Sequence, residues 1–215
     1  MYTPAMSDVK GKGQRAAKAQ QTRQRMLDAA RELFIEQGYG ATTLQEVADR
    51  AGVAVQTIYF TFGNKRSLLK ELVDTTIAGD DAPIATMDRQ WFRDALAAET
   101  AEAHLHQHVA GTRAVLERFA PITKMVSTAA ATDPDVATLW PQDTDPRYTV
   151  QSTAAKALMA KPGARADVSA EHAADLLHGL LSPELYLLFV RERGWSPEQW
   201  QHWAFATLRT QLCSD

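Results

Sequence analysis

The sequence predicts an all-α protein with a small N-terminal helix-turn-helix domain followed by a larger helical body. Apolar residues recur at helical spacing along most of the chain, and no alternating strand pattern of useful length is present. Gly52 separates two short amphipathic segments, which is typical of a tight turn between helices. Helix starts are marked by a cap residue followed by proline at positions 133, 145, 182 and 196.

The charge is distributed unevenly along the 215 residues. Residues 1–70 contain eleven Lys/Arg and six Asp/Glu, whereas residues 71–215 contain twelve Lys/Arg and twenty Asp/Glu. A basic N-terminal part on an acidic body predicts a polyanionic partner for the N-terminal part alone.

Composition also bears on the compartment. The single cysteine, Cys213, excludes an intrachain disulfide and fits a reducing compartment. We see no apolar run near the roughly 18 residues of a membrane span, and no apolar core of a signal peptide. We therefore expect a cytoplasmic protein without a membrane partner.

The first segment, residues 1–19, is predicted to be a disordered basic arm, since it is polar and lacks apolar periodicity. Its Lys10, Lys12, Arg15 and Lys18 could follow a DNA backbone or enter a minor groove. The alternative is a solvated tail. A scaffold helix is expected from about residue 20 to residue 37, with Gly38 as its stop.

The helix-turn-helix is expected next. Thr43 and Glu46 have the spacing of a capping box at a helix start, and Gly52 is the stop of that helix. The second helix, Val55–Phe62, is the one that enters the DNA major groove in such motifs. Asn64 is a candidate cap of the following helix, and Lys65 would place a cation where a phosphate lies.

These segments resemble the DNA-binding domain of the TetR family of bacterial transcriptional regulators. The resemblance covers about residues 20–75 and is carried by four blocks in order: QRMLDAARELFIEQGY (Gln24–Tyr39), ATTLQEV (Ala41–Val47), ADRAGV (Ala48–Val53) and TIYFTFGNKRSLL (Thr57–Leu69). It implies a DNA-binding domain over 20–77 and a helical ligand-binding and dimerisation domain over 86–215.

The resemblance also assigns DNA contacts. Gln56 is the best base reader, because its amide can pair bidentately with adenine. Phe60 could contact a thymine methyl group or pack on the first helix. Ala54 departs from the family, which often has Ser or Thr there, and removes a cap worth roughly 1 kcal/mol. The DNA-binding candidates are Val55, Gln56, Thr57, Tyr59, Phe60, Lys65 and Thr43.

The body is read as helices only. Asp88 could cap a helix that contains Trp91, and a long helix over about 98–119 should be interrupted by Pro121 before another at 122–131. Further helices are expected to start at caps, which are Asp133, Asp145, Ser169, Ser182 and Ser196.

The resemblance implies a small-molecule site and a symmetric dimer in this body. Polar or aromatic residues on otherwise apolar faces are the ligand candidates, although ordinary core packing explains each of them too: Trp91, His108, Phe119, Met125, Trp140, Tyr148 and His178. Helices that are apolar on several sides suggest either a central core or an interface between two copies. The interface candidates are Leu177, Leu181, Leu185, Trp200, Trp203 and Leu208.

Catalytic and metal chemistry lack support in the sequence. His104 and His108 share a helix face, but no carboxylate or cysteine joins them at ligand spacing. No nucleophile elbow, phosphate loop or HExxH motif is present, so we expect neither an enzyme nor a cofactor. The resulting hypothesis is a homodimeric repressor that leaves a palindromic operator when a small hydrophobic or aromatic effector binds. The alternative is a helical ligand-binding or scaffolding protein that does not read DNA sequence.

Overall fold

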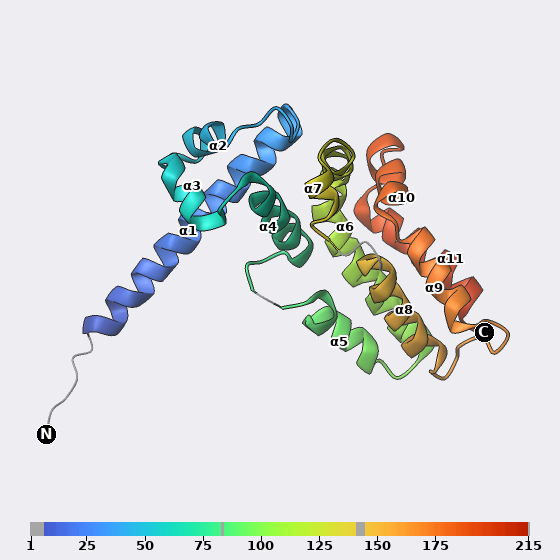
Figure 1. Cartoon of the computed structure of the whole chain (residues 1–215). Helices are drawn as coiled ribbons and strands as arrows, with labels where there is room; N and C mark the ends of the chain where they lie inside the picture. The colour runs from blue at the N-terminus through green and yellow to red at the C-terminus, as the bar shows by residue number, and fades with distance from the viewer. Residues whose placement is uncertain (1–6, 83, 141–144, 215) are drawn as a thin grey trace, which may run out of the picture. The chain divides into compact units, whose positions relative to one another are not determined.

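The computed structural model describes residues 7–82, 84–140 and 145–214, and the side chains from residue 14 onward. Within these ranges the regular structure is helical, apart from one isolated antiparallel bridge between Ala164 and Cys213 (Figure 1). The helices of the first half are α1 (Ser7–Glu36), α2 (Leu44–Ala51), α3 (Val55–Phe62), α4 (Lys65–Ala78), the 3-10 turn η1 (Thr86–Asp88) and α5 (Gln90–Ala97). Those of the second half are α6 (Ala101–Thr132), α7 (Pro134–Ala137), α8 (Pro146–Met159), α9 (Ala170–Leu180), α10 (Pro183–Leu187), the π-helical turn η2 (Leu188–Glu192) and α11 (Pro197–Leu212).

Helix α1 begins earlier than the sequence predicted. The expected disordered arm over residues 1–19 is wrong from Ser7 onward, because α1 starts there and runs unbroken to Glu36. Residues 1–6 lie outside the described part of the chain. The physical reason lies after Gly13, where Ala, Gln, Lys and Arg dominate and no proline intervenes. These are good helix formers, so a helix nucleated by a buried C-terminal half can propagate toward its N-terminus.

The chain packs as two units. The N-terminal unit extends through Leu72 and includes Met125–Leu139, and the C-terminal unit comprises Val73–Lys124 and the residues from Trp140 onward. Helices α4 and α6 therefore each contribute to both units. The sequence-based boundary at 78–86 followed the end of helicity, whereas packing divides α4 itself after Leu72.

In the N-terminal unit, one face of α1 packs against the short helices α2 and α3. Met26, Ala30 and Phe34 of α1 are buried, as are Val47 of α2 and Ile58 of α3. Leu68, Leu69 and Leu72 extend this core into α4. The tight α2–α3 corner is thus held on a helical platform, which leaves the opposite side of α3 exposed.

In the C-terminal unit, α8 packs along α9, and α11 packs against α9. The core is formed by fully buried side chains such as Leu105, Leu158, Leu177 and Trp200. The end of α4 is fastened in this unit by Arg118 of α6, whose guanidinium donates to the carbonyls of Thr76 (3.1 Å) and Ile77 (2.9 Å). These carbonyls are among those that a helix end leaves without an internal donor.

Two expectations about helix limits in the body are corrected. Pro121 does not interrupt its helix, because α6 runs continuously from Ala101 to Thr132 with the proline inside. Burial of Ala120 and Ile122 on either side outweighs the loss of one backbone hydrogen bond. Asp88 ends the η1 turn, and α5 starts after Arg89 without a side-chain cap. The starts after Asp133, Asp145, Ser169, Ser182 and Ser196 are confirmed by side-chain caps.

One segment is more apolar than the sequence analysis recognised. Ala170–Glu192 has the length and mean hydropathy (1.3) of a membrane-crossing helix, and about a third of it is buried in this chain. The segment is interrupted at Ser182–Pro183, where α10 starts anew. Length and composition of this kind also occur in the core helices of other proteins, and the fully exposed residues of this segment are mostly polar.

Candidate nucleic-acid interface

The corner between α2 and α3 is built by local interactions that the sequence predicts. The Thr43 hydroxyl accepts the Glu46 N–H (3.2 Å), and the Glu46 carboxylate accepts the Thr43 N–H (2.7 Å), which completes the capping box. Gly52 ends α2 with φ +67°, a conformation that favours glycine. The Val53 N–H donates to the Ala48 carbonyl (3.0 Å), so the chain turns directly into α3.

Helix α3 has one buried and one exposed side. Ile58 (0% exposed) and Phe62 (8%) face the core, whereas Gln56 and Tyr59 are exposed and Val55 and Thr57 are half-buried. Ala54 makes no side-chain cap, as expected. The exposed side therefore presents an amide and a phenol beside two smaller side chains, which is the residue chemistry that reads base edges and phosphates.

The sequence left open whether Phe60 packs on the first helix or faces a partner, and its position in the structure decides between the two. Its side chain is 93% exposed, so it does not pack on α1. An aromatic side chain this exposed buries almost no surface within the isolated chain, so it is available to a partner.

Lys65 has a different position from the one predicted. Its ammonium group donates to the carbonyls of Tyr39 (2.8 Å), Gly40 (3.3 Å) and Thr42 (2.9 Å), and lies 4.4 Å from the centre of the Tyr39 ring. All three N–H donors are thus used, and burial lowers the pKa of Lys65. The phosphate contact assigned to Lys65 is replaced by a structural role, which is to hold the α1–α2 loop on α4. The Thr43 hydroxyl is likewise occupied, because it caps α2 through Glu46.

Arg66, the next residue, also makes contacts within the N-terminal unit. It pairs with Asp133 (3.3 Å), the cap of α7, and with Asp135 (2.7 Å). The start of α4 is therefore tied to the α6–α7 corner by charge. The sequence contains no local signal for this pair, because its members are 67 residues apart.

Of the ligand candidates, Trp91 and His108 come together in the C-terminal unit. The His108 Nε2 lies 2.7 Å from the Gln151 amide oxygen, and the Trp91 and Phe92 rings lie 6.0 Å from the His108 ring. His108 is fully buried, its Nδ1 has no hydrogen-bond partner, and burial lowers its pKa. Burial likewise lowers the pKa of the neighbouring His104 to about 4, so both histidines are neutral at pH 7.

The other ligand candidates do not join this cluster. Tyr148 and His178 form a separate pair between α8 and α9, with ring centres 5.3 Å apart, and Arg147 donates to His178. The Trp140 indole reaches Asp74 (3.5 Å). Phe119 is half-buried on α6, and Met125 belongs to the N-terminal unit.

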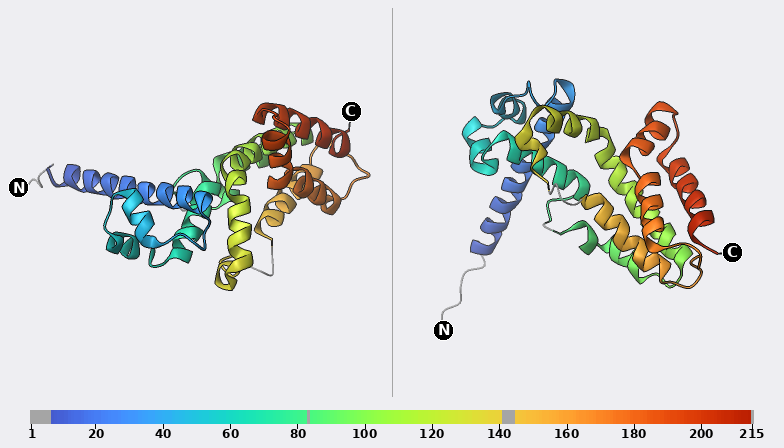
Figure 2. Two further views of the ribbon diagram at one scale, coloured as in Figure 1. Left: turned by 90° about the horizontal axis from the view of Figure 1, so that it is seen from above. Right: turned by 45° about the vertical axis from the view of Figure 1, so that its right-hand side comes forward.

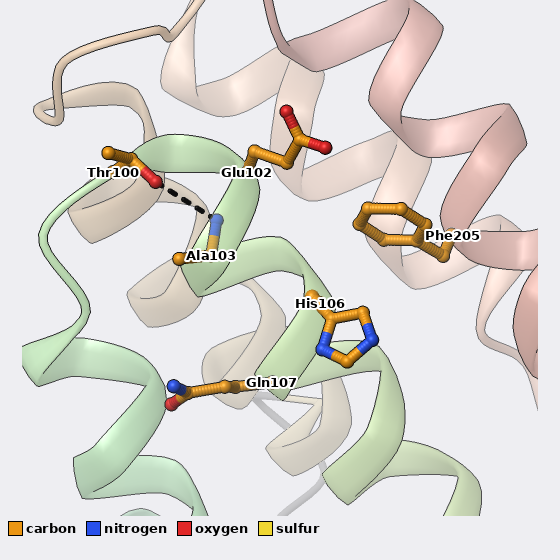
Figure 3. A pocket seen from close by; sticks show the side chains of 6 residues that line it. All are labelled: Thr100, Glu102, Ala103, His106, Gln107 and Phe205. Atoms are coloured by element: carbon orange, nitrogen blue, oxygen red, sulfur yellow. Dashed lines mark hydrogen bonds between the residues drawn. The ribbon is translucent and has the colours of Figure 1, made fainter.

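A surface pocket of about 440 Å³ was not anticipated from the sequence. It lies between the start of α6 and α11 (Figure 3) and is lined by Thr100, Glu102, Ala103, His106, Gln107 and Phe205. Glu102 is paired with Arg209 (3.0 Å), so the pocket offers no free carboxylate. Within the described residues no group of three or more His, Cys, Asp or Glu could hold a metal ion.

The prediction of the dimer interface is largely wrong, because most of its residues are buried within a single chain. Leu177, Leu181, Trp200 and Leu208 are 0% exposed within a single chain, so a second copy cannot touch them. Leu185 and Trp203 are half-buried. The physical reason is that α9 packs against both α8 and α11, so these side chains lie in the core that the three helices share. Apolar side chains that remain partly or largely exposed on the neighbouring faces are Leu176, Leu180, Leu188 and Phe205.

The comparison with known families agrees with the helix-turn-helix geometry of α2 and α3. The family model described as "Bacterial regulatory proteins, tetR family" matches residues 26–72, which span the buried half of α1, both helices of the corner and most of α4. Over these residues the N-terminal domain matches the TetR family. SrpR of Pseudomonas putida, an HTH-type transcriptional regulator, is 35% identical over 79 residues, which cover 35% of this chain and 37% of SrpR.

Solved structures extend the similarity beyond the N-terminal domain to the helical body. A Mesorhizobium loti protein assigned to the TetR-family transcriptional regulators superposes with a TM-score of 0.66 at 19% identity, covering 91% of this chain and 98% of that one. A transcriptional regulator from Saccharomonospora viridis, crystallised in complex with choline, gives 0.65 at 18% identity, covering 91% and 99%. At these identities the likeness concerns the fold. It confirms an all-helical chain with the helix-turn-helix at its N-terminus.

Proposed function

We propose that this protein is a sequence-specific DNA-binding transcriptional regulator. The observation that carries the proposal is the exposed side of α3, where Gln56, Tyr59 and Phe60 point away from a buried core on a corner that matches the TetR-family model. A helix placed this way can enter the major groove with side chains on base edges.

Each exposed residue has a role that its chemistry suits. The Gln56 amide would read adenine, and Phe60 and Val55 would contact thymine methyl groups. The hydroxyls of Thr57 and Tyr59 would bind phosphates and set the register. Lys65 would act indirectly, because it holds the loop that precedes α2.

The test is fluorescence anisotropy on a duplex obtained by selection from random-sequence DNA, with a scrambled duplex as reference. We expect a Kd of about 10⁻⁸ M or better and a preference of at least about a thousandfold at physiological salt. Gln56→Ala should weaken specific binding about 10- to 100-fold, since one bidentate base contact is worth about 1–3 kcal/mol. Gln45→Ala, an exposed glutamine on α2, is the matched control. Equal affinity of wild type for both duplexes would exclude sequence reading and favour a ligand-binding or scaffolding role.

We further propose a homodimer that binds a palindromic operator and represses transcription by occupying it in the cytoplasm. Apolar side chains that are only half-buried on α9 and in the η2 turn, such as Leu176, Leu180 and Phe189, support association through this part of the chain. Leu176 and Leu180 are one turn apart on α9 and flank the exposed Gly179. Two copies joined there would supply two recognition helices for two half-sites.

Sedimentation velocity tests the dimer. We expect wild type to sediment as a dimer at micromolar concentration, and Leu176→Asp/Leu180→Asp to shift it to monomer, because burying two carboxylates in an apolar interface is unfavourable. Ala157→Asp, a half-buried site on α8, controls for a general effect of a new charge. A monomeric wild type, or a variant that remains dimeric, would contradict the proposed interface.

A small effector is the last part of the proposal. The buried Trp91–Phe92–His108 cluster, with its unpaired His108 Nδ1, has the aromatic and polar character of a small-molecule site. The choline complex of the Saccharomonospora viridis protein shows that a chain of this fold can bind a small molecule. The anisotropy assay, repeated with choline and a set of small aromatic compounds, should report release of the duplex. No release, together with no thermal stabilisation by any compound, would remove the effector from the proposal.

A further inference from the structure

The N-terminal half of α1 extends past the helices that its C-terminal half supports. Every residue from 14 to 21 is exposed, whereas Met26, Leu27, Ala29 and Ala30 are buried. Figures 1 and 2 show these first turns continuing beyond α2 and α3. An exposed stretch of this length buries no apolar surface, so packing within the chain does not explain it.

The basic residues of this stretch gather on one face. Arg15, Lys18 and Arg25 stand at i, i+3 and i+10, with Thr22 between them at i+7, which is the spacing of one helix face. The same face continues with Ala29 and Leu33, which are buried against the helix-turn-helix. The stripe therefore lies on the side of α1 where α2 and α3 pack.

Arg25 connects this stripe to the DNA-reading corner. A Cβ atom on Gly52 would lie 3.8 Å from the Arg25 guanidinium nitrogen, so the guanidinium lies over the glycine of the α2–α3 turn. By the helical rise, Arg15 and Arg25 are about 15 Å apart along the axis. The stripe is thus long enough to meet several phosphates, which recur every 3.4 Å of axis on each DNA strand.

The stripe carries charge that its own unit does not neutralise. Residues 9–27 contain six Lys/Arg and no Asp/Glu. Arg23, off this face, pairs with Glu71 and lies 5.0 Å from the centre of the Phe62 ring. In contrast, Arg15, Lys18 and Arg25 form no ion pair with the part of the chain that the structure describes.

We propose that Arg15, Lys18 and Arg25 form a second DNA contact, in which the projecting half of α1 binds the phosphate backbone of the duplex beside the stretch that α3 reads. The proposal rests on the proposed function and extends its footprint. A row of cations on one helix face suits a row of phosphates, and such contacts add affinity and position the protein without adding base preference.

The test compares wild type with Arg15→Ala/Lys18→Ala in the anisotropy assay over a salt series. Alanine preserves helix propensity, and neither side chain contacts the core, so the fold should be unaffected, as far-UV circular dichroism will check. We expect the slope of log K against log salt to become shallower by about 1.8, which is 0.9 for each of two lost phosphate contacts. Affinity for the selected and the scrambled duplex should fall by the same factor, which leaves their ratio unchanged.

The matched control is Lys124→Ala/Lys156→Ala, which removes two exposed positive charges from α6 and α8 and should leave the slope unchanged. An unchanged slope in Arg15→Ala/Lys18→Ala, with specific binding intact, overturns the second contact and leaves the proposed function standing. A shallower slope on both duplexes in a protein without sequence preference supports the contact while the proposed function fails. A wild type that binds neither duplex overturns both the second contact and the proposed function. An equal change of slope in Lys124→Ala/Lys156→Ala shows that net charge causes the effect, which overturns the second contact.

Discussion

Replacing Trp200 by alanine is expected to destabilise the fold by about 3–5 kcal/mol, the usual loss when a buried Trp or Phe is truncated. Trp200 is 0% exposed and packs edge-on against Tyr186, with ring centres 5.1 Å apart. Domains of this size have a free energy of unfolding of about 5–15 kcal/mol, so the loss is about a fifth of the total or more. Urea denaturation followed by circular dichroism measures it as a lower midpoint.

Trp203 is the control for this prediction, because it lies three residues further along α11 and is half-buried. Its ring packs on Phe189 at 4.7 Å and near Trp195 at 6.1 Å, so its truncation should destabilise less than that of Trp200. The pair separates two hypotheses for Trp200. If Trp200 is a core residue, its truncation lowers the free energy of unfolding at every protein concentration. If Trp200→Ala unfolds at the wild-type midpoint but sediments as a monomer, the interface role that the sequence suggested would be restored.

Gly111→Ala is expected to destabilise the C-terminal unit even though it improves helix propensity. A Cβ atom at this position of α6 would lie 2.1 Å from Cε3 of the Trp91 ring, a distance that requires the ring to move. Such overpacking costs typically 1–3 kcal/mol and occasionally more, against a propensity gain of about 1 kcal/mol. Because 2.1 Å is a severe overlap, we expect a cost in the upper part of that range and a net loss of about 1–2 kcal/mol, measured by urea denaturation.

The Trp91→Leu background tests the cause of this loss. Without the large ring, Gly111→Ala should become neutral or stabilising, so the double-mutant cycle should give a coupling of about 1–3 kcal/mol. The displaced ring would also lose its contacts with Phe92 (5.5 Å) and His108 (6.0 Å). Equal effects of Gly111→Ala in both backgrounds would show that the ring does not cause the loss.

The features that the sequence predicts well depend on neighbours in the chain. The capping boxes of Thr43 with Glu46 and of Ser196 with Gln199 form as expected, because the partners are three residues apart. The stop at Gly52 and the absent cap at Ala54 are equally local. The helix-turn-helix itself could therefore be derived from spacing alone, and with it the buried side of α3.

Contacts between residues far apart in the sequence cannot be predicted from local patterns. Lys65 was expected to bind phosphate because its place at a helix start was visible, but its three carbonyl acceptors come from residues 39–42. An apolar pattern shows that a helix has a face to bury and does not identify the helix that covers it. For this reason Leu177, Trp200 and Leu208 were assigned to a dimer surface, although α9 and α11 bury them within one chain.

By itself, the sequence determined the helical class, the helix-turn-helix corner with its buried Ile58 and Phe62, and the charge difference between the two parts of the chain. Only the tertiary structure decided that Phe60 is exposed, that Lys65 is structural, and that Arg15 and Lys18 belong to a helix with a basic face. The physical reason is one of range. Caps, turns and periodicity act over a few residues, whereas exposure and ion pairing depend on which segments pack together.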